Sequence, residues 1–166
     1  DEINNVLVAI AEHLNANVES IVLANSKDLS RMDKSDPRYD RLLLNKERIE
    51  AIAQDTLNVA SLPSSLNIEL SKTVRPNGMV IRKVSVPFGV IGVIYEARPN
   101  VTIDVFNLCF KAGSAAVLKG GKEAADTNEC LANLIHQVLN EHHLPEALCT
   151  LLPNNHHATT EMLSAV

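Results

Sequence analysis

Apolar residues recur with a helical period at the start of the chain. The apolar positions up to about Asn25 are Ile3, Val6, Leu7, Ile10, Leu14, Val18, Ile21 and Val22. Spacings of three and four place such side chains along one stripe of a single amphipathic helix. The polar stretch 32–39 contains Pro37, which predicts an exposed loop after this helix.

A second amphipathic helix is predicted from about Lys46 to Ala60. Asn45 suits the N-cap position, because its side chain can accept a hydrogen bond from the first free amides of the helix. Pro63 follows the predicted end. The residues expected to face inward are Ile49, Ile52, Ala53 and Leu57. Both helices have the pattern of an amphipathic cover for a core, and nothing in them suggests chemistry.

The period changes to alternation over residues 68–86, which predicts a β-hairpin. Asn77 and Gly78 lie between two β-rich runs, and this pair favours the positive φ angles of a tight turn. A two-stranded ribbon is only marginally stable alone. We therefore expect the hairpin to pack either on another subunit, as an arm, or on its own domain.

From residue 86 the pattern reads strand, helix, strand, helix, strand. The strands are predicted at 86–95, in "SAAVLKGG" and in "ALCTLLP". The first intervening helix begins at Pro99 and ends at Gly113, and the second runs over 122–142. The inward residues expected are Val101, Val105, Leu108, Cys109 and Ala112 on the first helix, and Leu131, Leu134, Ile135, Val138 and Leu139 on the second.

Two β-α-β units with short connections predict a parallel sheet with right-handed crossovers. The continuous apolar run of the first strand is expected where both faces of a sheet are covered. The fold class is therefore α/β, with N-terminal helices and a hairpin before a partial, doubly wound parallel sheet. The final residues predict another helix, and we expect the chain to be part of something longer.

Composition narrows the class of protein. The 166 residues are 46% hydrophobic and 21% charged, as in a soluble globular domain. The net charge of −5 and the absence of tryptophan argue against a nucleic-acid partner. No apolar run has the length of a membrane helix, and no signal segment opens the chain. These features predict a cytoplasmic protein without a membrane partner.

The cysteines and histidines do not form a metal-binding pattern. Cys109, Cys130 and Cys149 are scattered in apolar segments, so they are expected to be reduced, buried thiols, with a reactive thiol as the alternative. The paired histidines at 142–143 and 156–157 are neighbours that project in different directions on a helix, and they are expected to be solvated rather than metal ligands. No metal is expected.

Candidate chemistry follows the first two predicted strands. Ligands of open α/β sheets bind beyond the carboxyl ends of the strands, near helix N-termini. The first such end carries 95–100, "YEARPN", and the second carries 119–122, "KGGK". Glycines allow close approach of a ligand, free amides at a helix start favour anions, and lysines add charge suited to a phosphate. Together they predict a pocket for anionic groups.

Each signal also has a structural interpretation. "LKGGK" is neither a dinucleotide fingerprint nor a Walker loop, and a plain strand-to-helix turn would explain it. Arg98 could cap a helix or pair with Asp104, and Glu96 could make a structural hydrogen bond. These alternatives remain open from the residues alone.

The segment "VSVPFGVIGVIYEARPNVTIDVFNLCFKAGSAAVLKGGKEA" resembles the γ-glutamyl phosphate reductase (glutamate-5-semialdehyde dehydrogenase) family, a branch of the aldehyde dehydrogenase superfamily. "DRLLLNKERIEAIA" and "RPNGMVIRKVSVPFG" resemble its N-terminal region. The resemblance implies NADPH-dependent reduction of L-γ-glutamyl 5-phosphate to L-glutamate 5-semialdehyde in proline biosynthesis. It implies a helical part at 1–67, an oligomerisation arm at 68–86 and the first half of a Rossmann-type sheet at 87–166, in a homo-oligomer.

The resemblance also implies roles for individual residues. Lys119 falls where a lysine meets the adenosine ribose. Lys122 replaces a glutamate found in NAD-preferring members, which favours the 2′-phosphate of NADPH. Gly120 and Gly121 complete this cofactor segment, and the strand end expected to run along the cofactor comprises Val93, Ile94 and Tyr95.

The substrate residues implied are Glu96, Arg98 and Asn100. Arg98 could clamp the acyl phosphate or the substrate carboxylate, because its fork matches both. Glu96 departs from the superfamily, whose oxyanion-hole asparagine falls at this position, since a carboxylate disfavours a developing oxyanion. Asn100 could supply the amide instead.

The catalytic cysteine of the family lies beyond residue 166 in this placement. Its thiolate displaces phosphate to form a thioester, and hydride from NADPH releases the aldehyde. The chain alone is therefore expected to be inactive. Two other interpretations stay open, a different aldehyde dehydrogenase-like acyl reductase and a non-catalytic assembly domain.

Overall fold

The computed structural model describes residues 2–164. Two helices, α1 (Glu2–Ala16) and α2 (Val18–Ser30), open the chain. The expectation of one continuous helix is wrong, because the chain bends by 70° between them. Asn17 lies at the bend with φ −110° and ψ 21°, and its side chain donates to the carbonyl of His13 at 2.8 Å. An asparagine that bonds the preceding turn competes with helix continuation.

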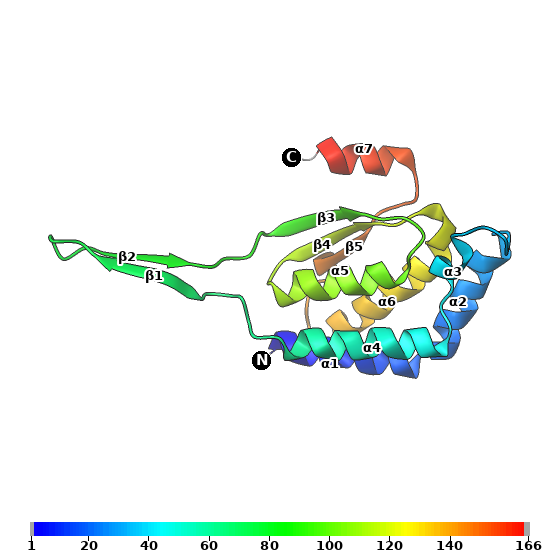
Figure 1. Ribbon diagram of the computed structural model, residues 1–166, viewed down its shortest axis with the longest axis horizontal. Coiled ribbons are helices and arrows are strands. Elements are labelled where there is room, and N and C mark those ends of the chain that lie inside the picture. The colour runs from blue at the N-terminus through cyan, green and yellow to red at the C-terminus, as the bar shows by residue number, and fades with distance from the viewer. Residues whose placement is uncertain (1, 165–166) are drawn as a thin grey trace.

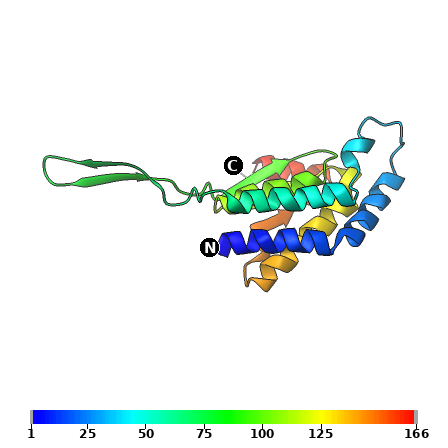
Figure 2. The ribbon, with the colours of Figure 1, turned by 60° about the horizontal axis from the view of Figure 1, so that its bottom comes forward.

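Two further helices precede the hairpin. The loop predicted after α2 is present, and it ends in the short helix α3 (Tyr39–Leu42). Helix α4 (Lys46–Ser61) confirms the predicted cap, because Asn45 Oδ1 accepts from the amide of Arg48 at 2.9 Å. Helices α1 and α4 lie side by side (Figures 1 and 2).

The predicted hairpin is formed by β1 (Glu69–Val74) and β2 (Val80–Val84), which pair antiparallel. Gly78 takes the positive φ of the turn, at 83°. Every residue of both strands is exposed, and the hairpin projects from the body of the molecule (Figure 1). The ribbon therefore does not pack on its own domain.

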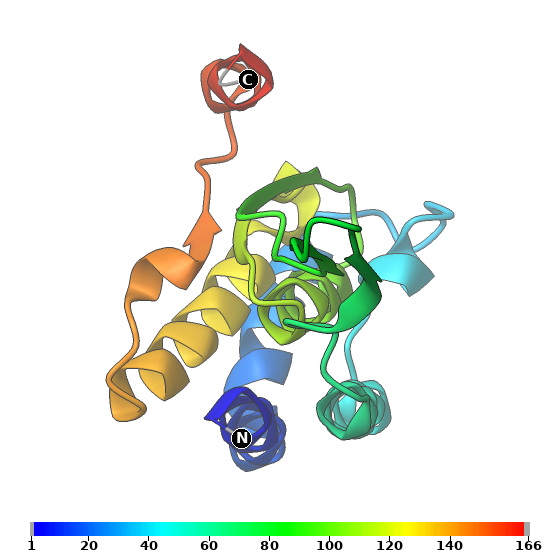
Figure 3. The ribbon, with the colours of Figure 1, turned by 90° about the vertical axis from the view of Figure 1, so that its left-hand side faces the viewer.

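The sheet has the predicted parallel strands in the order β3-β4-β5. They are β3 (Val90–Ile94), β4 (Ala115–Lys119) and β5 (Cys149–Leu151). Helices α5 (Asn100–Lys111) and α6 (Ala125–Glu141) cover one face, and α7 (His156–Ser164) lies over the other (Figures 1 and 3). Short 3₁₀ turns precede α6 at Lys122–Ala124 and β5 at Glu146–Leu148.

Strand β3 is shorter and more open than expected. It begins at Val90, because Pro87 cannot donate to a ladder and Gly89 has φ 101°. Its residues alternate in burial, and Val90 on the outer face is 70% exposed. The expectation that both faces of this strand are covered is therefore wrong for the described residues.

The prediction for helix α5 is wrong for Leu108, whereas Cys109 is buried and Val105 packs against the core as predicted. Leu108 is exposed, while Phe106 and Phe110 are buried and stack with ring centroids 5.3 Å apart. The helix lies between the sheet and the layer of α1 and α4, so residues on two sides of it are covered (Figure 1). Its predicted end is confirmed: Gly113 has φ 73°, and its amide and that of Ser114 bond carbonyls of the last turn.

The core lies between α1, α4, α5, α6 and the inner face of the sheet. The inward residues predicted for α6 are all buried. Ile49, Ile52 and Ala53 of α4 are buried as predicted, and Leu57 packs against them. Among residues 2–164, no single helix is long and apolar enough to cross a membrane; only α1 and α2 taken together reach that length and composition.

Candidate functional site

The two segments predicted to carry chemistry meet at one edge of the sheet. Ile94 pairs with Lys119 in the parallel register, and the amide of Tyr95 donates to the carbonyl of Lys119 at 3.0 Å. A Cβ added to Gly121 would lie 3.4 Å from the Cα of Glu96. The segments 95–100 and 119–122 are therefore in contact just beyond the carboxyl ends of β3 and β4.

Burial alternates along the loop that leaves β3. Ala97 is 5% exposed and Pro99 is also buried, whereas Glu96 and Arg98 are exposed. The amide of Arg98 donates to the carbonyl of Glu96 at 2.5 Å, which tightens the turn. Two buried residues thus anchor the loop and leave the carboxylate and the guanidinium free to face a ligand.

Glu96 and Arg98 line one pocket of about 230 Å³. Two arginines from the segment before α4, Arg38 and Arg41, complete its charged lining. Arg38 pairs with Asp36 at 2.8 Å and with Glu123 at 3.3 Å. The hydrogen bonds that Arg38 donates to Asp36 are the main cause of the raised pKa of Arg38. The pocket therefore has a positive lining that contains a single carboxylate, Glu96.

Asn100 is separated from Glu96 and Arg98. Its Nδ2 donates to Asp104 Oδ2 at 2.9 Å on its own helix, and it lines a second pocket of about 190 Å³. Arg41 lines both pockets. Burial raises the pKa of Asp104, and the bond from Asn100 opposes that rise. The structural alternative in which Arg98 pairs with Asp104 is not observed, since Asn100 contacts that carboxylate.

The strand ends differ in what they expose. Ile94 and Lys119 point to the open face, but Lys119 is only 9% exposed and its Nζ donates to the carbonyl of Gly120 at 3.0 Å. Ile94 is 47% exposed, and Val93, on the opposite face, is partly buried. Ile94 is thus the residue of this strand end that is most open to a ligand.

A buried polar chain lies directly behind Gly120. The hydroxyl of Tyr95 bonds Thr102 Oγ1 at 2.7 Å, and Thr102 in turn donates to Asn128 Oδ1 at 3.0 Å. Burial raises the pKa of Tyr95 to about 12. A Cβ on Gly120 would lie 2.2 Å from Asn128 Nδ2, so only glycine permits this approach. Gly120 and Tyr95 therefore have a structural part in the turn.

The amides at the start of α6 are not free for an anion, which corrects the expectation for this helix. Asp28 of α2 accepts from the amides of Asp126 at 3.2 Å and Thr127 at 2.8 Å. Its carboxylate is also in contact with Arg31. Lys122 remains exposed beside this group and lines a pocket of about 210 Å³ with Asp28 and Arg31.

Sequence reasoning missed four of these residues. Arg38 and Arg41 fall in a polar segment that reads as a solvated loop, and Asp28 lies on a helix assigned to cover the core. Asn128 lies in α6, where its burial has no sequence signal. The "DRLLL" segment that contains Arg41 was the available hint, because it belongs to the family resemblance.

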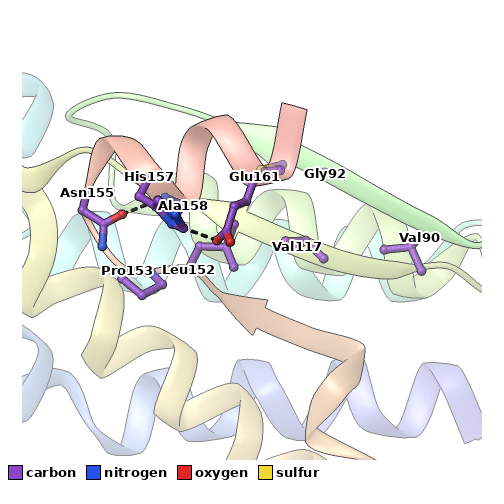
Figure 4. A pocket seen from close by; sticks show the side chains of 10 residues that line it. Val90, Gly92, Val117, Leu152, Pro153, Asn155, His157, Ala158 and Glu161 are labelled. Atoms are coloured by element: carbon purple, nitrogen blue, oxygen red, sulfur yellow. Dashed lines mark hydrogen bonds and ion pairs between the residues drawn. The ribbon is translucent and has the colours of Figure 1, made fainter. Parts of the chain in front are cut away.

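A larger hollow of about 650 Å³ lies between α7 and the open face of the sheet (Figure 4). Its floor includes Val90, Gly92 and Val117, and α7 contributes His157 and Glu161, which pair at 3.2 Å. It begins at the amino end of β3 and contains none of the predicted site residues. It is the space that remains between α7 and the sheet face beneath it.

The three cysteines are free thiols. Cys109 and Cys149 are buried and Cys130 is partly buried, as predicted for small core residues. Burial raises the pKa of all three thiols, that of Cys149 to about 12. Within residues 2–164, no group of three or more histidine, cysteine or acidic side chains is arranged to hold a metal.

Comparison of structures defines the class of protein. A probable aldehyde dehydrogenase from Listeria monocytogenes matches 98% of this chain with a TM-score of 0.69, at 12% identity and over 34% of its own length. That likeness shows the fold alone. The chain thus shares the fold of part of an aldehyde dehydrogenase, and the candidate site lies at one edge of the parallel sheet within that part. No protein-family model matches the chain.

Sequence comparison specifies the family. The gamma-glutamyl phosphate reductase of Parabacteroides distasonis is 56% identical over 161 residues, which cover 97% of this chain and 39% of that protein. The crystal structure of gamma-glutamyl phosphate reductase from Thermotoga maritima matches 98% of the chain with a TM-score of 0.91 and 31% identity. Over nearly its whole length, this chain is related to the N-terminal portion of the gamma-glutamyl phosphate reductases. It spans about two fifths of their length.

Proposed function

We propose that this chain is the first part of the cofactor-binding half of a γ-glutamyl phosphate reductase. The enzyme would reduce L-γ-glutamyl 5-phosphate to L-glutamate 5-semialdehyde with NADPH and release phosphate, in proline biosynthesis. The identity of 56% to a reductase over 161 residues carries the proposal. The contact between segments 95–100 and 119–122 supports it, because one edge of the sheet then presents both groups of predicted site residues.

A nicotinamide dinucleotide fits the residues at this edge. Gly121 presents a backbone without a side chain beside Glu96, and Ile94 offers an apolar surface. Lys122 offers an exposed ammonium group that pairs with no carboxylate among residues 2–164. Lys119 and Tyr95 would contribute mainly by shaping the turn, since their polar ends already bond Gly120 and Thr102. When bound, the cofactor supplies the hydride of the reaction.

The preference for NADPH over NADH is proposed from Lys122. An exposed lysine attracts the 2′-phosphate that distinguishes NADPH, and Arg31 beside it is already paired with Asp126 at 2.5 Å. In the full-length enzyme, Lys122→Glu should raise the KM for NADPH. The KM for NADH should stay unchanged or fall. Equal effects on both cofactors would contradict this part of the proposal.

We also propose that residues 68–86 assemble the enzyme as a homo-oligomer. The arm exposes a series of large apolar side chains, and Phe88 after it is 91% exposed. Contiguous apolar surface of this kind marks interaction sites. A second copy of the chain could cover this apolar surface and pair its own strands with those of the hairpin.

The central experiment assays the full-length protein in the reverse direction. We expect phosphate-dependent reduction of NADP with L-glutamate 5-semialdehyde, and little activity with simple aldehydes. The catalytic cysteine is proposed to lie beyond residue 166, consistent with the raised pKa values of the three thiols described here. Their free state also agrees with the proposed cytoplasmic location. Efficient CoA-dependent oxidation of simple aldehydes would instead indicate a different acyl reductase.

A further inference from the structure

Two arginines in the pocket of Glu96 have no partner in the described part of the chain. Arg31, Arg38 and Arg48 each pair with a carboxylate, whereas no ion pair or side-chain hydrogen bond involves Arg41 or Arg98. Both nevertheless line the same 230 Å³ pocket. Two guanidinium groups in one small pocket repel each other, so an anionic ligand would relieve that repulsion.

The backbone that carries Arg41 is held firmly. Asn25, which is fully buried, donates to the carbonyl of Leu42 and accepts from the amide of Leu44, both at 2.8 Å. Arg48 donates to the carbonyl of Leu43 at 2.9 Å. These bonds fix the backbone directly after Arg41, and buried Ala97 and Pro99 fix the backbone on either side of Arg98. The two guanidinium groups are therefore carried by fixed backbone positions on two different segments of the chain.

The charges of the pocket match an amino-acid head group. Arginine binds a carboxylate in a forked geometry, and the carboxylate of Glu96 can accept from an ammonium group. A phosphate dianion suits the pocket less well, because Glu96 would repel it. Arg38 also lines the pocket, but it already pairs with Asp36 and Glu123. The remaining charges, two free arginines and one glutamate, are complementary to a zwitterion.

We propose that this pocket binds the α-amino-acid end of the γ-glutamyl substrate. Arg41 and Arg98 hold the α-carboxylate, and Glu96 holds the α-ammonium group. This inference rests on the proposed function and adds Arg41 as a substrate-binding residue. It also gives Glu96 a role at the position where the wider superfamily has an oxyanion-hole amide.

The test uses the full-length enzyme in the reverse reaction with glutamate semialdehyde, phosphate and NADP. Arg41→Gln and Arg98→Gln should each raise the KM for glutamate semialdehyde by roughly tenfold to a hundredfold, the range of a lost charge-assisted hydrogen bond. The KM for phosphate should stay unchanged. Glu96→Gln should abolish the preference for glutamate semialdehyde over glutarate semialdehyde, which lacks the ammonium group. Lys34→Gln removes a charge from the neighbouring loop without touching the pocket, and should match the wild type.

Two results would overturn the inference. One is a raised KM for phosphate, rather than for the semialdehyde, in the arginine variants. The other is an unchanged KM for both. Calorimetric titration with L-glutamate gives a readout independent of turnover, and binding to the wild type as weak as to Arg41→Gln would also refute the pocket. A wild-type enzyme that binds L-glutamate through Arg41 but turns over no glutamate semialdehyde would refute the proposed function alone.

Discussion

Asp28 and Thr127 are joined by two hydrogen bonds, although 99 positions separate them. Asp28 Oδ2 accepts from the amide of Thr127 at 2.8 Å and from its hydroxyl at 2.5 Å. Both residues are buried, and Asn25 donates to the same hydroxyl at 3.2 Å. A carboxylate from α2 thus performs the capping that no residue of α6 itself provides. This contact attaches the N-terminal helices to the turn that follows β4.

Replacement of this cap should destabilise the protein. Asp28→Asn removes the negative charge at the start of α6 and the pairing with Arg31. We expect a loss of about 1–2 kcal/mol in the free energy of unfolding, measured by urea denaturation of the full-length protein. Glu50→Gln, which affects only an exposed pair with Lys46, should cost a few tenths of a kcal/mol at most. Equal effects of the two changes would contradict the capping role.

The two glycines after β4 should respond differently to alanine. Gly120→Ala places a methyl group against the buried amide of Asn128, so we expect a loss of about 1–3 kcal/mol in unfolding free energy. Gly121→Ala meets the end of the Glu123 side chain at 2.8 Å, which can move away. It should leave thermal stability nearly unchanged. If Gly121→Ala proved the more destabilising, the packing behind Gly120 would be disproved.

Tyr95 should titrate late and reduce stability in strong alkali. Its pKa rises from 10.0 to about 12 on folding, so the folded state binds this proton more tightly than the unfolded state does. The resulting stabilisation is complete below pH 10 and is lost as the pH rises toward 12. The absorbance difference between the full-length protein and its Tyr95→Phe variant, followed across the alkaline range, isolates the tyrosinate of Tyr95. Titration of Tyr95 near 10 in the native state would contradict the burial of its hydroxyl.

The thiols of this chain should resist alkylation. Burial raises the pKa of Cys109, Cys130 and Cys149, which lowers the fraction of reactive thiolate at neutral pH. The native full-length protein is treated with iodoacetamide, and labelling is followed by peptide mass mapping. Cys109 and Cys149 should be labelled far more slowly in the native protein than in the unfolded protein. Cys130, which is only partly buried, should react at an intermediate rate. Rapid labelling of Cys149 would contradict its burial in β5.

If residues 68–86 assemble the enzyme as proposed, a charged substitution on this arm should weaken assembly. Val74 and Val80 form a cross-strand pair on one face of the hairpin, and both are exposed. Val80→Glu in the full-length protein should shift sedimentation velocity profiles toward smaller species, because a charge would be buried in the proposed subunit contact. Lys83→Gln on the same ribbon serves as the control. A wild-type protein that sediments as a monomer would remove the assembly role of the arm.

Local patterns predicted the elements of the fold well. The cap at Asn45, the turn at Gly78 and the stop at Gly113 were predictable because each depends on a few neighbouring residues. The bend at Asn17 was not predictable, because the hydrophobic stripe continues through it. The orientation of α5 was not predictable either, because packing on two sides of the helix determines it. The elements that pack against a helix determine which of its apolar side chains are buried.

The candidate site was predictable only in part. Adjacent parallel strands bring Glu96 and Gly121 together, and the order of elements implies this. Arg41 and Asp28 reach the same region from the N-terminal helices, and no spacing rule relates them to the strand ends. The separation of Asn100 from Glu96 and Arg98 likewise depends on its bond to Asp104 within α5.

Along residues 96–99, buried positions that hold the loop alternate with exposed positions. Requirements of folding and of chemistry therefore act on different residues. Ala97 and Pro99 are determined by the interior, whereas Glu96 and Arg98 carry little of the packing. In the proposed reductase, replacement of these two outward side chains would alter which small molecule is accepted without changing the packing of the loop. Such a turn offers an evolving enzyme a short route from one substrate to another.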